Sequence, residues 1–205
     1  MRRHIALAVV SIALFAAPRA ARAAALTVEG YYGLARPSSV DFESAVGTVN
    51  SHLFHDSLNI AGADVILHLG LLELGAIGDV TFKSNSASQT AIGALAGVGF
   101  ELGQLRLEAL GEAGGHRIGN ITENPNIVTS SSGSEWLAYV GLRPGIAYRF
   151  GPSSGVILGL WGYARWDVTD KHVPVTVSSA SGTAPGELKL GGTTVGVTAR
   201  VGFDF

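Results

Sequence analysis

The most constraining feature of this sequence is a two-residue alternation of apolar side chains with polar residues or glycine, repeated in eight segments. The segments are 26–34, 61–70, 71–82, 90–102, 105–112, 136–150, 156–167 and 193–205. A period of two places the apolar side chains on one face of a β-strand and the polar ones on the other. Segments of about ten residues with this pattern are typical of strands that cross a membrane in a closed barrel.

Composition supports a membrane barrel and argues against spanning helices. Charged residues make up 15% of the chain, against about 25% in an average protein. Glycine supplies 28 of the 205 residues, about twice its usual share of roughly 7%. Beyond the first 23 residues the longest apolar run is Ala91–Phe100, and a spanning helix needs about 20 residues. A closed β-barrel is the remaining way for such a chain to cross a lipid bilayer.

The N-terminus has the three-part layout of a secretory signal peptide. A basic start, Met1–His4, precedes an apolar run, Ile5–Ala17, and the small-residue pattern Ala21-Arg22-Ala23 follows. The apolar run is too short to span a membrane as a helix. We therefore expect a signal peptide over residues 1–23 and a barrel over residues 24–205, with cleavage after Ala24 or Ala25 as alternatives.

Charge and cysteine content exclude several partner classes. Removal of the signal lowers Lys+Arg from 14 to 10 against 16 Asp+Glu, which leaves a net charge near −6. Such a balance argues against nucleic acid as a partner. The absence of cysteine excludes a disulfide-stapled scaffold and a lipid anchor on a cysteine.

The lengths of the connections predict which strand ends share a side. Long polar connections at 35–60, 83–89, 117–135 and 168–192 alternate with short turns at 70–71, 103–104 and 151–154. This alternation gathers the long loops at one end of an antiparallel up-and-down barrel and the tight turns and both termini at the other. The turn at Gly70-Leu71 has one turn-forming residue, and without it the barrel would have seven strands.

A soluble barrel of the lipocalin type is the main rival, and it would place the apolar faces inside. Two features favour the membrane orientation: glycines on the charged faces leave room for long side chains in a narrow lumen, and aromatic residues close both ends of the apolar faces. The aromatic residues are Tyr32, Phe82, Trp136 and Trp166 towards the long loops, and Phe100, Tyr148, Phe150, Phe203 and Phe205 towards the short turns.

The charged faces predict a network of ion pairs in the lumen. Its members are Glu29, Asp64, Glu73, Asp79, Glu101, Glu108, Glu112, Arg106, Arg143, Arg149, Arg165 and Arg200. Buried charges need partners, so we expect each arginine to contact one or two carboxylates. In a barrel of eight strands this network is expected to plug the lumen, and an ion pathway is the alternative.

The closing stretch Thr198–Phe205 combines these features, with Arg200 and Asp204 on one face and Val201, Phe203 and Phe205 on the other. In this respect, and in its signal and eight segments, the chain resembles the small eight-stranded outer-membrane proteins of Gram-negative bacteria, such as the OmpA transmembrane domain, OmpX and OmpW. The resemblance implies a monomer in the outer membrane, surrounded by lipid and lipopolysaccharide, with Phe205 read by the barrel-insertion machinery. The long loops are rich in Ser, Thr, Asn and Gly, and loops of this length are usually functional or disordered. We therefore expect a non-enzymatic surface-interaction platform that recognises partners through its loops, and we expect no metal or cofactor.

Two other function classes stay open as alternatives: a small pore, and an enzyme that modifies lipid A. For the enzyme, His116 and His172 lie near the expected outer rim, and the loops contain serines at 130–132 and 178–179. Their spacing fixes no catalytic triad, because triads are defined by geometry.

Four further features have a functional and a simpler interpretation. His52 and His55 with Asp56 are a weak metal-site candidate, and 120–122 matches a glycosylation acceptor that chance explains better. Trp161 and Tyr163 line a ligand pocket or pack over luminal glycine.

Pro144 lacks a ladder N–H in the middle of a strand, so we expect a β-bulge there.

Overall fold

The computed structural model describes residues 25–37, 40–44, 47–51, 57–82, 88–119, 127–128, 134–151, 155–179 and 182–205. The predicted signal peptide lies outside these residues, as do the motif at 120–122, the serines at 130–132, and His52, His55 and Asp56. Among the described residues, no helix has the length and apolar character needed to cross a membrane.

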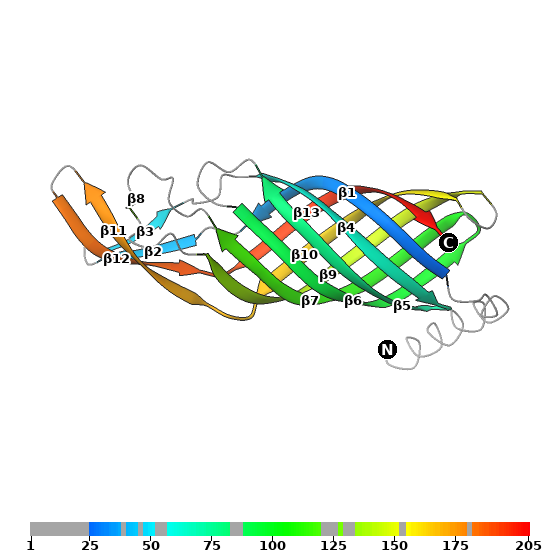
Figure 1. Ribbon diagram of the computed structural model, residues 1–205, viewed down its shortest axis with the longest axis horizontal. Helices are drawn as coiled ribbons and strands as arrows, with labels where there is room; N and C mark the ends of the chain where they lie inside the picture. Colours follow the sequence, from blue (N-terminus) through cyan, green and yellow to red (C-terminus); the bar gives the residue numbers. More distant parts are fainter. Residues whose placement is uncertain are drawn as a thin grey trace, which may run out of the picture.

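Eight antiparallel strands close into a barrel (Figure 1). In chain order they are β1 (Ala25–Pro37), β4 (Leu58–Leu69), β5 (Leu72–Phe82), β6 (Ser88–Leu102), β7 (Leu105–Gly119), β9 (Glu135–Phe150), β10 (Val156–Asp167) and β13 (Thr193–Asp204). Consecutive barrel strands are neighbours, and β13 closes the barrel by pairing with β1. The predicted eight-stranded up-and-down barrel is confirmed.

Two tight turns join barrel strands where the sequence predicts them. Gly70 and Gly103 take the left-handed conformation, with φ of 71° and 70°, which glycine adopts without steric cost. Leu69 pairs with Leu72 across the first of these turns. The doubtful turn at 70–71 is therefore present, and the strand number is even.

The stagger of the strands sets the width of the barrel. A path that follows cross-strand partners once round the barrel leaves β1 at Arg36 and returns to it at Leu26, ten residues away. Such a stagger requires the strands to tilt, typically by about 35–45°. With eight strands, the interior is just wide enough to be filled by side chains.

The side chains of the barrel are apolar outside and charged inside. Aliphatic residues of the outer face, such as Leu142 and Ile92, each expose 57% of their surface, whereas Glu73 and Arg143 expose 1%. A soluble barrel would show the reverse, because water would then surround the outer face. The membrane orientation is the one that the sequence predicts.

Pro144 does not produce the expected bulge. Trp161 pairs with Gly145 on one side of the proline and Ala164 pairs with Leu142 on the other, so the register of β9 against β10 is unchanged. Between them the β9–β10 pairing is interrupted opposite Pro144, while Ala109 still pairs with Pro144 on the other side. The missing N–H of Pro144 therefore leaves a local gap in the β9–β10 hydrogen-bond ladder and does not shift the register. The prediction of a bulge is wrong.

Three of the long connections contain strands that the sequence analysis treated as loop. A second sheet, the loop sheet, has the order β3 (Gly47–Ser51), β2 (Val40–Ser44), β12 (Gly182–Leu190), β11 (Lys171–Ser179) and β8 (Ile127–Val128). It extends beyond the loop end of the barrel (Figure 1). Val173, Val175 and Val177 alternate along β11, and this β-branched pattern is the signal from which the hairpin could have been predicted.

Two glycines test the assignment of inside and outside. A Cβ atom on Gly145, which faces the lumen, would lie 2.5 Å from Cε3 of Trp161, whereas one on Gly162, on the outer face, would lie 3.7 Å from Cγ of Pro144. We expect Gly145→Ala to lower the free energy of unfolding by about 1–3 kcal/mol through overpacking. Gly162→Ala should be neutral when both are unfolded by urea from lipid bilayers; an equal loss in the two variants would contradict the assignment.

Candidate functional site

The lumen holds two separate clusters of ion pairs, and the larger one lies towards the tight turns. Its centre is Arg200, whose Nη1 donates a hydrogen bond of 2.9 Å to Oε2 of Glu29 while Nη2 contacts Glu108. Nε of Arg106 lies 2.8 Å from the other oxygen of Glu108, and Nη2 contacts Glu73. The shared carboxylate of Glu108 links β1, β5, β7 and β13 through charge-assisted contacts.

The same cluster continues to the turn end of the barrel. Arg149 lies 2.9 Å from Glu101 and also contacts Asp204. The hydroxyl of Thr27 donates to Asp204 and lies 2.6 Å from Nε2 of His68. These contacts join the first and last strands of the barrel, β1 and β13, to β4, β6 and β9.

The second cluster lies towards the long loops and is centred on Arg165. Its guanidinium forms a fork on Asp79, with a distance of 3.1 Å from Nη1 to Oδ1, and Nη2 lies 2.8 Å from Glu112. Tyr31 donates a hydrogen bond of 3.0 Å to Asp79, and Tyr139 donates to Glu112. One arginine and two phenols thus contact two buried carboxylates, and Oε2 of Glu112 is left without a hydrogen-bond partner among the described residues.

Arg143 departs from the predicted pattern. Among the described residues no carboxylate pairs with it, and its Nε and Nη1 have no hydrogen-bond partner. Its guanidinium instead lies 4.8 Å from the ring centroid of Tyr31 and 5.3 Å from that of Trp161. A guanidinium is attracted to aromatic faces, so these rings take the place of the carboxylate, and the expectation of an acidic partner is wrong for this arginine.

Asp64 is a buried carboxylate that, like Arg143 among the arginines, forms no ion pair among the described residues. It lies directly opposite Glu29 on the neighbouring strand and is 2% exposed. Neither of its oxygens has a hydrogen-bond partner within the described residues. The register places Asp64 beside Glu29, which already holds Arg200, and the charges of Arg143 and Arg200 act on Asp64 without a hydrogen bond.

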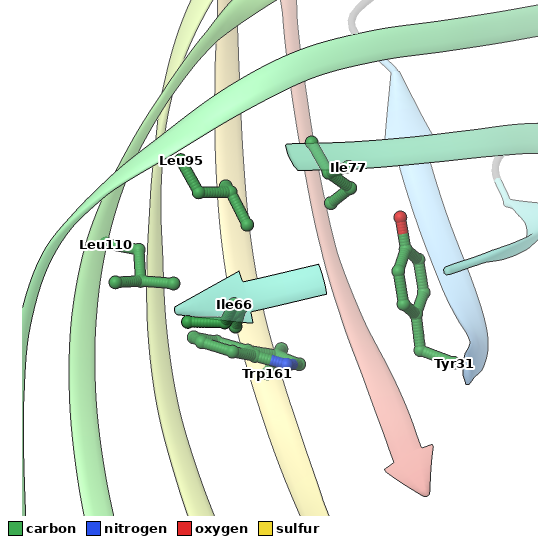
Figure 2. Packing of buried hydrophobic residues seen from close by; sticks show 6 residues of the cluster. All are labelled: Tyr31, Ile66, Ile77, Leu95, Leu110 and Trp161. Atoms are coloured by element: carbon green, nitrogen blue, oxygen red, sulfur yellow. The ribbon is translucent and has the colours of Figure 1, made fainter. Parts of the chain in front are cut away.

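An apolar layer lies in the lumen beside these charges, and the sequence analysis missed it. Its six residues are Tyr31, Ile66, Ile77, Leu95, Leu110 and Trp161 (Figure 2). They occupy inward positions of their strands, where the alternation predicts polar residues or glycine. An apolar residue in the polar phase of a strand was the signal that could have identified them.

Trp161 and Tyr163 pack over luminal glycines, which is the simpler of the two interpretations of this pair. Trp161 is fully buried over Gly145, and Tyr163 lies over Gly196, where an added Cβ would be 2.4 Å from the ring. A small cavity at the loop end, lined by Tyr163, His116 and Arg165 among others, measures about 10 Å³. That is roughly the space of one water molecule.

The aromatic residues of the outer face lie near both ends of the barrel. Towards the loops, the rings of Tyr32 and Phe82 are 6.1 Å apart, and towards the turns Tyr148 and Phe150 meet edge to face at 4.9 Å. The other exposed members are Trp136, Trp166, Phe203 and Phe205, while Phe100 is half-buried. Rings at these positions suit the two interfaces of a lipid bilayer.

The two rim histidines lie in different environments. His116 faces the lumen, where it is 5% exposed, stacks on Tyr139 and has Nε2 at 3.3 Å from Asp167. His172 is exposed on β11 beside Glu187. The described part of the chain contains no group of three metal-ligating side chains, and His116 lies on the opposite side of the barrel wall from the lipid.

Comparison with known proteins identifies the fold. No protein-family model and no curated protein sequence matches the chain. The crystal structure of the outer membrane protein OprG from Pseudomonas aeruginosa matches with a TM-score of 0.61 at 11% identity, covering 90% of this chain and 97% of OprG. The fold is that of a small outer-membrane β-barrel.

Two other outer-membrane β-barrels match at lower TM-scores. Neisserial surface protein A (NspA) has a TM-score of 0.48 and 10% identity over 88% of this chain and 99% of its own. The N-terminal β-barrel domain of OprF from Pseudomonas aeruginosa has a TM-score of 0.43 and 15% identity over 88% and 97%. The match to OprG confirms, at the level of the fold, the resemblance predicted from the sequence.

Arg200 and Lys171 provide a comparison between a buried and an exposed cation. The side chain of Arg200 is fully buried between two carboxylates, whereas that of Lys171 is half exposed with its Nζ 4.0 Å from Glu135. Arg200→Ala should lower the free energy of unfolding by about 3–5 kcal/mol, because it leaves two buried carboxylates without their shared cation. Lys171→Ala should change it by less than about 1 kcal/mol. Urea unfolding from bilayers measures both, and equal losses would argue against the luminal network.

Proposed function

We propose that this protein is a non-enzymatic barrel of the Gram-negative outer membrane that presents the loop sheet as a recognition surface. Closure of the barrel pairs backbone groups between strands, which a lipid environment requires. The apolar outer face with aromatic residues at both ends supports a position in the bilayer. The ion pairs and the apolar layer support a lumen that is closed to solutes, and the surrounding lipid and lipopolysaccharide are the partners expected of the barrel wall.

The open edge of the loop sheet is the observation that carries the proposed recognition. β3 pairs with β2 on one side, and no described strand pairs with its other side. Proteins usually protect an open edge with lysine, proline or a covering segment. The sequence of β3, Gly-Thr-Val-Asn-Ser, contains neither a charge nor a proline.

The opposite side of the sheet carries the protection that β3 lacks. β8 pairs with β11 only at Thr176 and Val177, and the remainder of β11 contains Lys171 and Pro174. This contrast favours β3 as the edge that binds a partner. An extended peptide segment, added as a further strand through main-chain hydrogen bonds, is the class of ligand that such an edge accepts.

The loop sheet is tied to the barrel, which supports a preformed binding surface. The backbone N–H of Asp167 donates to the carbonyl of Gly192 at 2.9 Å, and that of Val168 donates to Ala138 at 2.9 Å. Ala138 also donates to the hydroxyl of Thr169 at 3.0 Å. A preformed edge pays a smaller entropic cost on binding than a flexible loop.

The two rival functions have weaker support. A lipid A-modifying enzyme needs its base at the lipid-facing rim, and His116 lies inside the lumen. A constitutive pore needs a continuous path, and the loop-end and turn-end cavities measure about 10 Å³ each. Overexpression that changes the mass spectrum of lipid A in a His116-dependent manner would favour the enzyme.

Location in the outer membrane is tested by fractionation and gel mobility. We expect the protein in the outer-membrane fraction, with an amide-I infrared band of β-structure and a faster mobility on SDS gels before boiling than after it, because closed barrels resist unfolding by detergent. Recovery in the soluble periplasmic fraction, or a helical spectrum, would rule out the proposal.

Proline substitutions in β3 test recognition through its edge. Consecutive N–H groups of a strand point in opposite directions. Of the two variants Thr48→Pro and Val49→Pro, one therefore loses an outward donor, which is an N–H group that points away from β2, and the other loses an N–H group that donates to β2. Short unstructured peptides selected for binding to the protein in lipid nanodiscs should bind about tenfold more weakly to the variant that loses the outward donor. Val49→Thr, which keeps every backbone donor, is the control.

Peptides that bind both proline variants as tightly as the parent protein would show that the β3 edge is not the site. Binding that survives deletion of residues 168–192 would show that β11 and β12 are not needed for recognition, and binding that survives deletion of residues 40–51 would place recognition outside the β3 edge. The amide NMR shifts of Gly47–Ser51 on addition of peptide give an independent measurement of where it binds.

A further inference from the structure

The apolar layer of the lumen extends round the barrel and is here called the septum. Its members, Tyr31, Ile66, Ile77, Leu95, Leu110 and Trp161, come from six of the eight barrel strands, and each is at most 5% exposed. Figure 2 shows their side chains gathered between the strands. The two other strands complete the ring: β9 supplies Arg143, stacked on Tyr31 and Trp161, and β13 supplies the buried Thr198, directly opposite Trp161.

The septum separates the two clusters of ion pairs. On β7, Leu110 is the single inward residue between Glu108, which contacts Arg200, and Glu112, which contacts Arg165. On β5, Ile77 lies between Glu73 of the turn-end cluster and Asp79 of the loop-end cluster. An ion that crosses the barrel must therefore leave one charged cluster, pass the septum and enter the other.

The cavities have the same division. The loop-end cavity is lined by Asp79, Thr81, His116 and Arg165 among others, and the turn-end cavity by Glu101, Arg106 and Arg149 among others. No septum residue lines either of them. Polar space is thus present on both sides of the septum.

We infer that the septum, and not the ion-pair network, is the barrier that closes the lumen to ions. Transfer of an ion from water into an apolar environment is strongly unfavourable, and an apolar constriction blocks ions by excluding water. The charged side chains of the two clusters, by contrast, offer water and ions polar partners, whereas the one charged group in the ring, Arg143, is covered by the rings of Tyr31 and Trp161. The inference rests on the closed lumen of the proposed function and assigns that closure to specific residues.

Conductance of single barrels in planar bilayers tests the septum directly. Leu95→Ser combined with Leu110→Ser makes two of its side chains smaller and polar, and should turn a silent barrel into one with stepwise conductance. The matched control is Asp79→Asn combined with Arg165→Gln, which removes the charges of the loop-end pair and leaves the septum intact. It should stay silent. A silent septum variant that is folded by gel mobility, or a conducting control, overturns the inference.

Sided modification of cysteine gives a test that leaves the septum unchanged. The chain has no cysteine of its own, so Thr81→Cys and Thr27→Cys place one thiol on the loop side and one on the turn side of the septum. Ag⁺ added from the loop side should react with Thr81→Cys at least about ten times faster than with Thr27→Cys. Because Thr81 lies on the loop side of Asp79, the rate at Thr27→Cys is also measured with Asp79→Asn and Arg165→Gln added, and it should stay slow. Equal rates at Thr81→Cys and Thr27→Cys, or a fast rate at Thr27→Cys once the loop-end charges are removed, refutes the inference.

These measurements separate the inference from the proposed function. Conductance of the parent protein would contradict the closed lumen itself. A silent parent protein with a conducting ion-pair control would contradict the septum alone, and peptide binding at β3 is independent of both.

Discussion

Closure of the hydrogen-bond ladder is the constraint on which the rest of this structure depends. A backbone that lies in lipid has no water to bind, so every strand needs two neighbours, and β13 supplies the second neighbour of β1. The stagger of ten residues that accompanies closure leaves a lumen that side chains fill. Because lipid surrounds the barrel, the apolar residues of each strand face outwards and the charged residues face into this narrow space.

The crowded lumen explains how its charges are arranged. Several long side chains of the lumen lie over glycine, as Trp161 does over Gly145 and Tyr163 over Gly196. Arg165 and Arg200 have carboxylates beside them in the lumen. Arg165 forms a forked pair with one carboxylate, and Arg200 bridges two. Arg143 projects into the apolar layer of the lumen, which is filled by aromatic rings and aliphatic side chains. Stacking on the rings is the interaction available to its guanidinium there. Along the barrel axis the lumen therefore contains a polar layer, an apolar layer and a second polar layer. It is not filled by one uniform network of salt bridges.

The loop sheet shows how a barrel of this kind can carry a recognition surface without a further domain. β11 begins four residues beyond the end of β10, and β12 ends shortly before β13 begins. Hydrogen bonds at Asp167, Val168 and Ala138 hold this connection to the barrel. The rigid scaffold that the membrane imposes on the barrel thus supports the strands outside it, and the unprotected edge of β3 is held in a defined place.

The amino-acid pattern was enough to predict the eight barrel strands and their approximate bounds. It also predicted the ends at which loops and turns gather and the side of each barrel strand that faces lipid. These properties are local: they depend on a two-residue period, on glycine at turns such as Gly70, and on where aromatic residues fall along a segment. The candidate charges could be named for the same reason, because an arginine in the polar phase of such a strand has to face the lumen.

Which charges meet depends on the stagger of the strands, and this became known from the three-dimensional fold. Register places Asp64 beside Glu29 and leaves Arg143 among Tyr31, Trp161 and Tyr163, and neither outcome is contained in the sequence of one strand. The septum also depends on register, because its six residues come from six strands. At Pro144 the register stays unchanged because the neighbouring strands on both sides are fixed, and this overrides the local preference for a bulge. The loop sheet pairs segments from three connections, which no single segment predicts. Long-range pairing brings together residues whose separation along the chain gives no indication that they will meet.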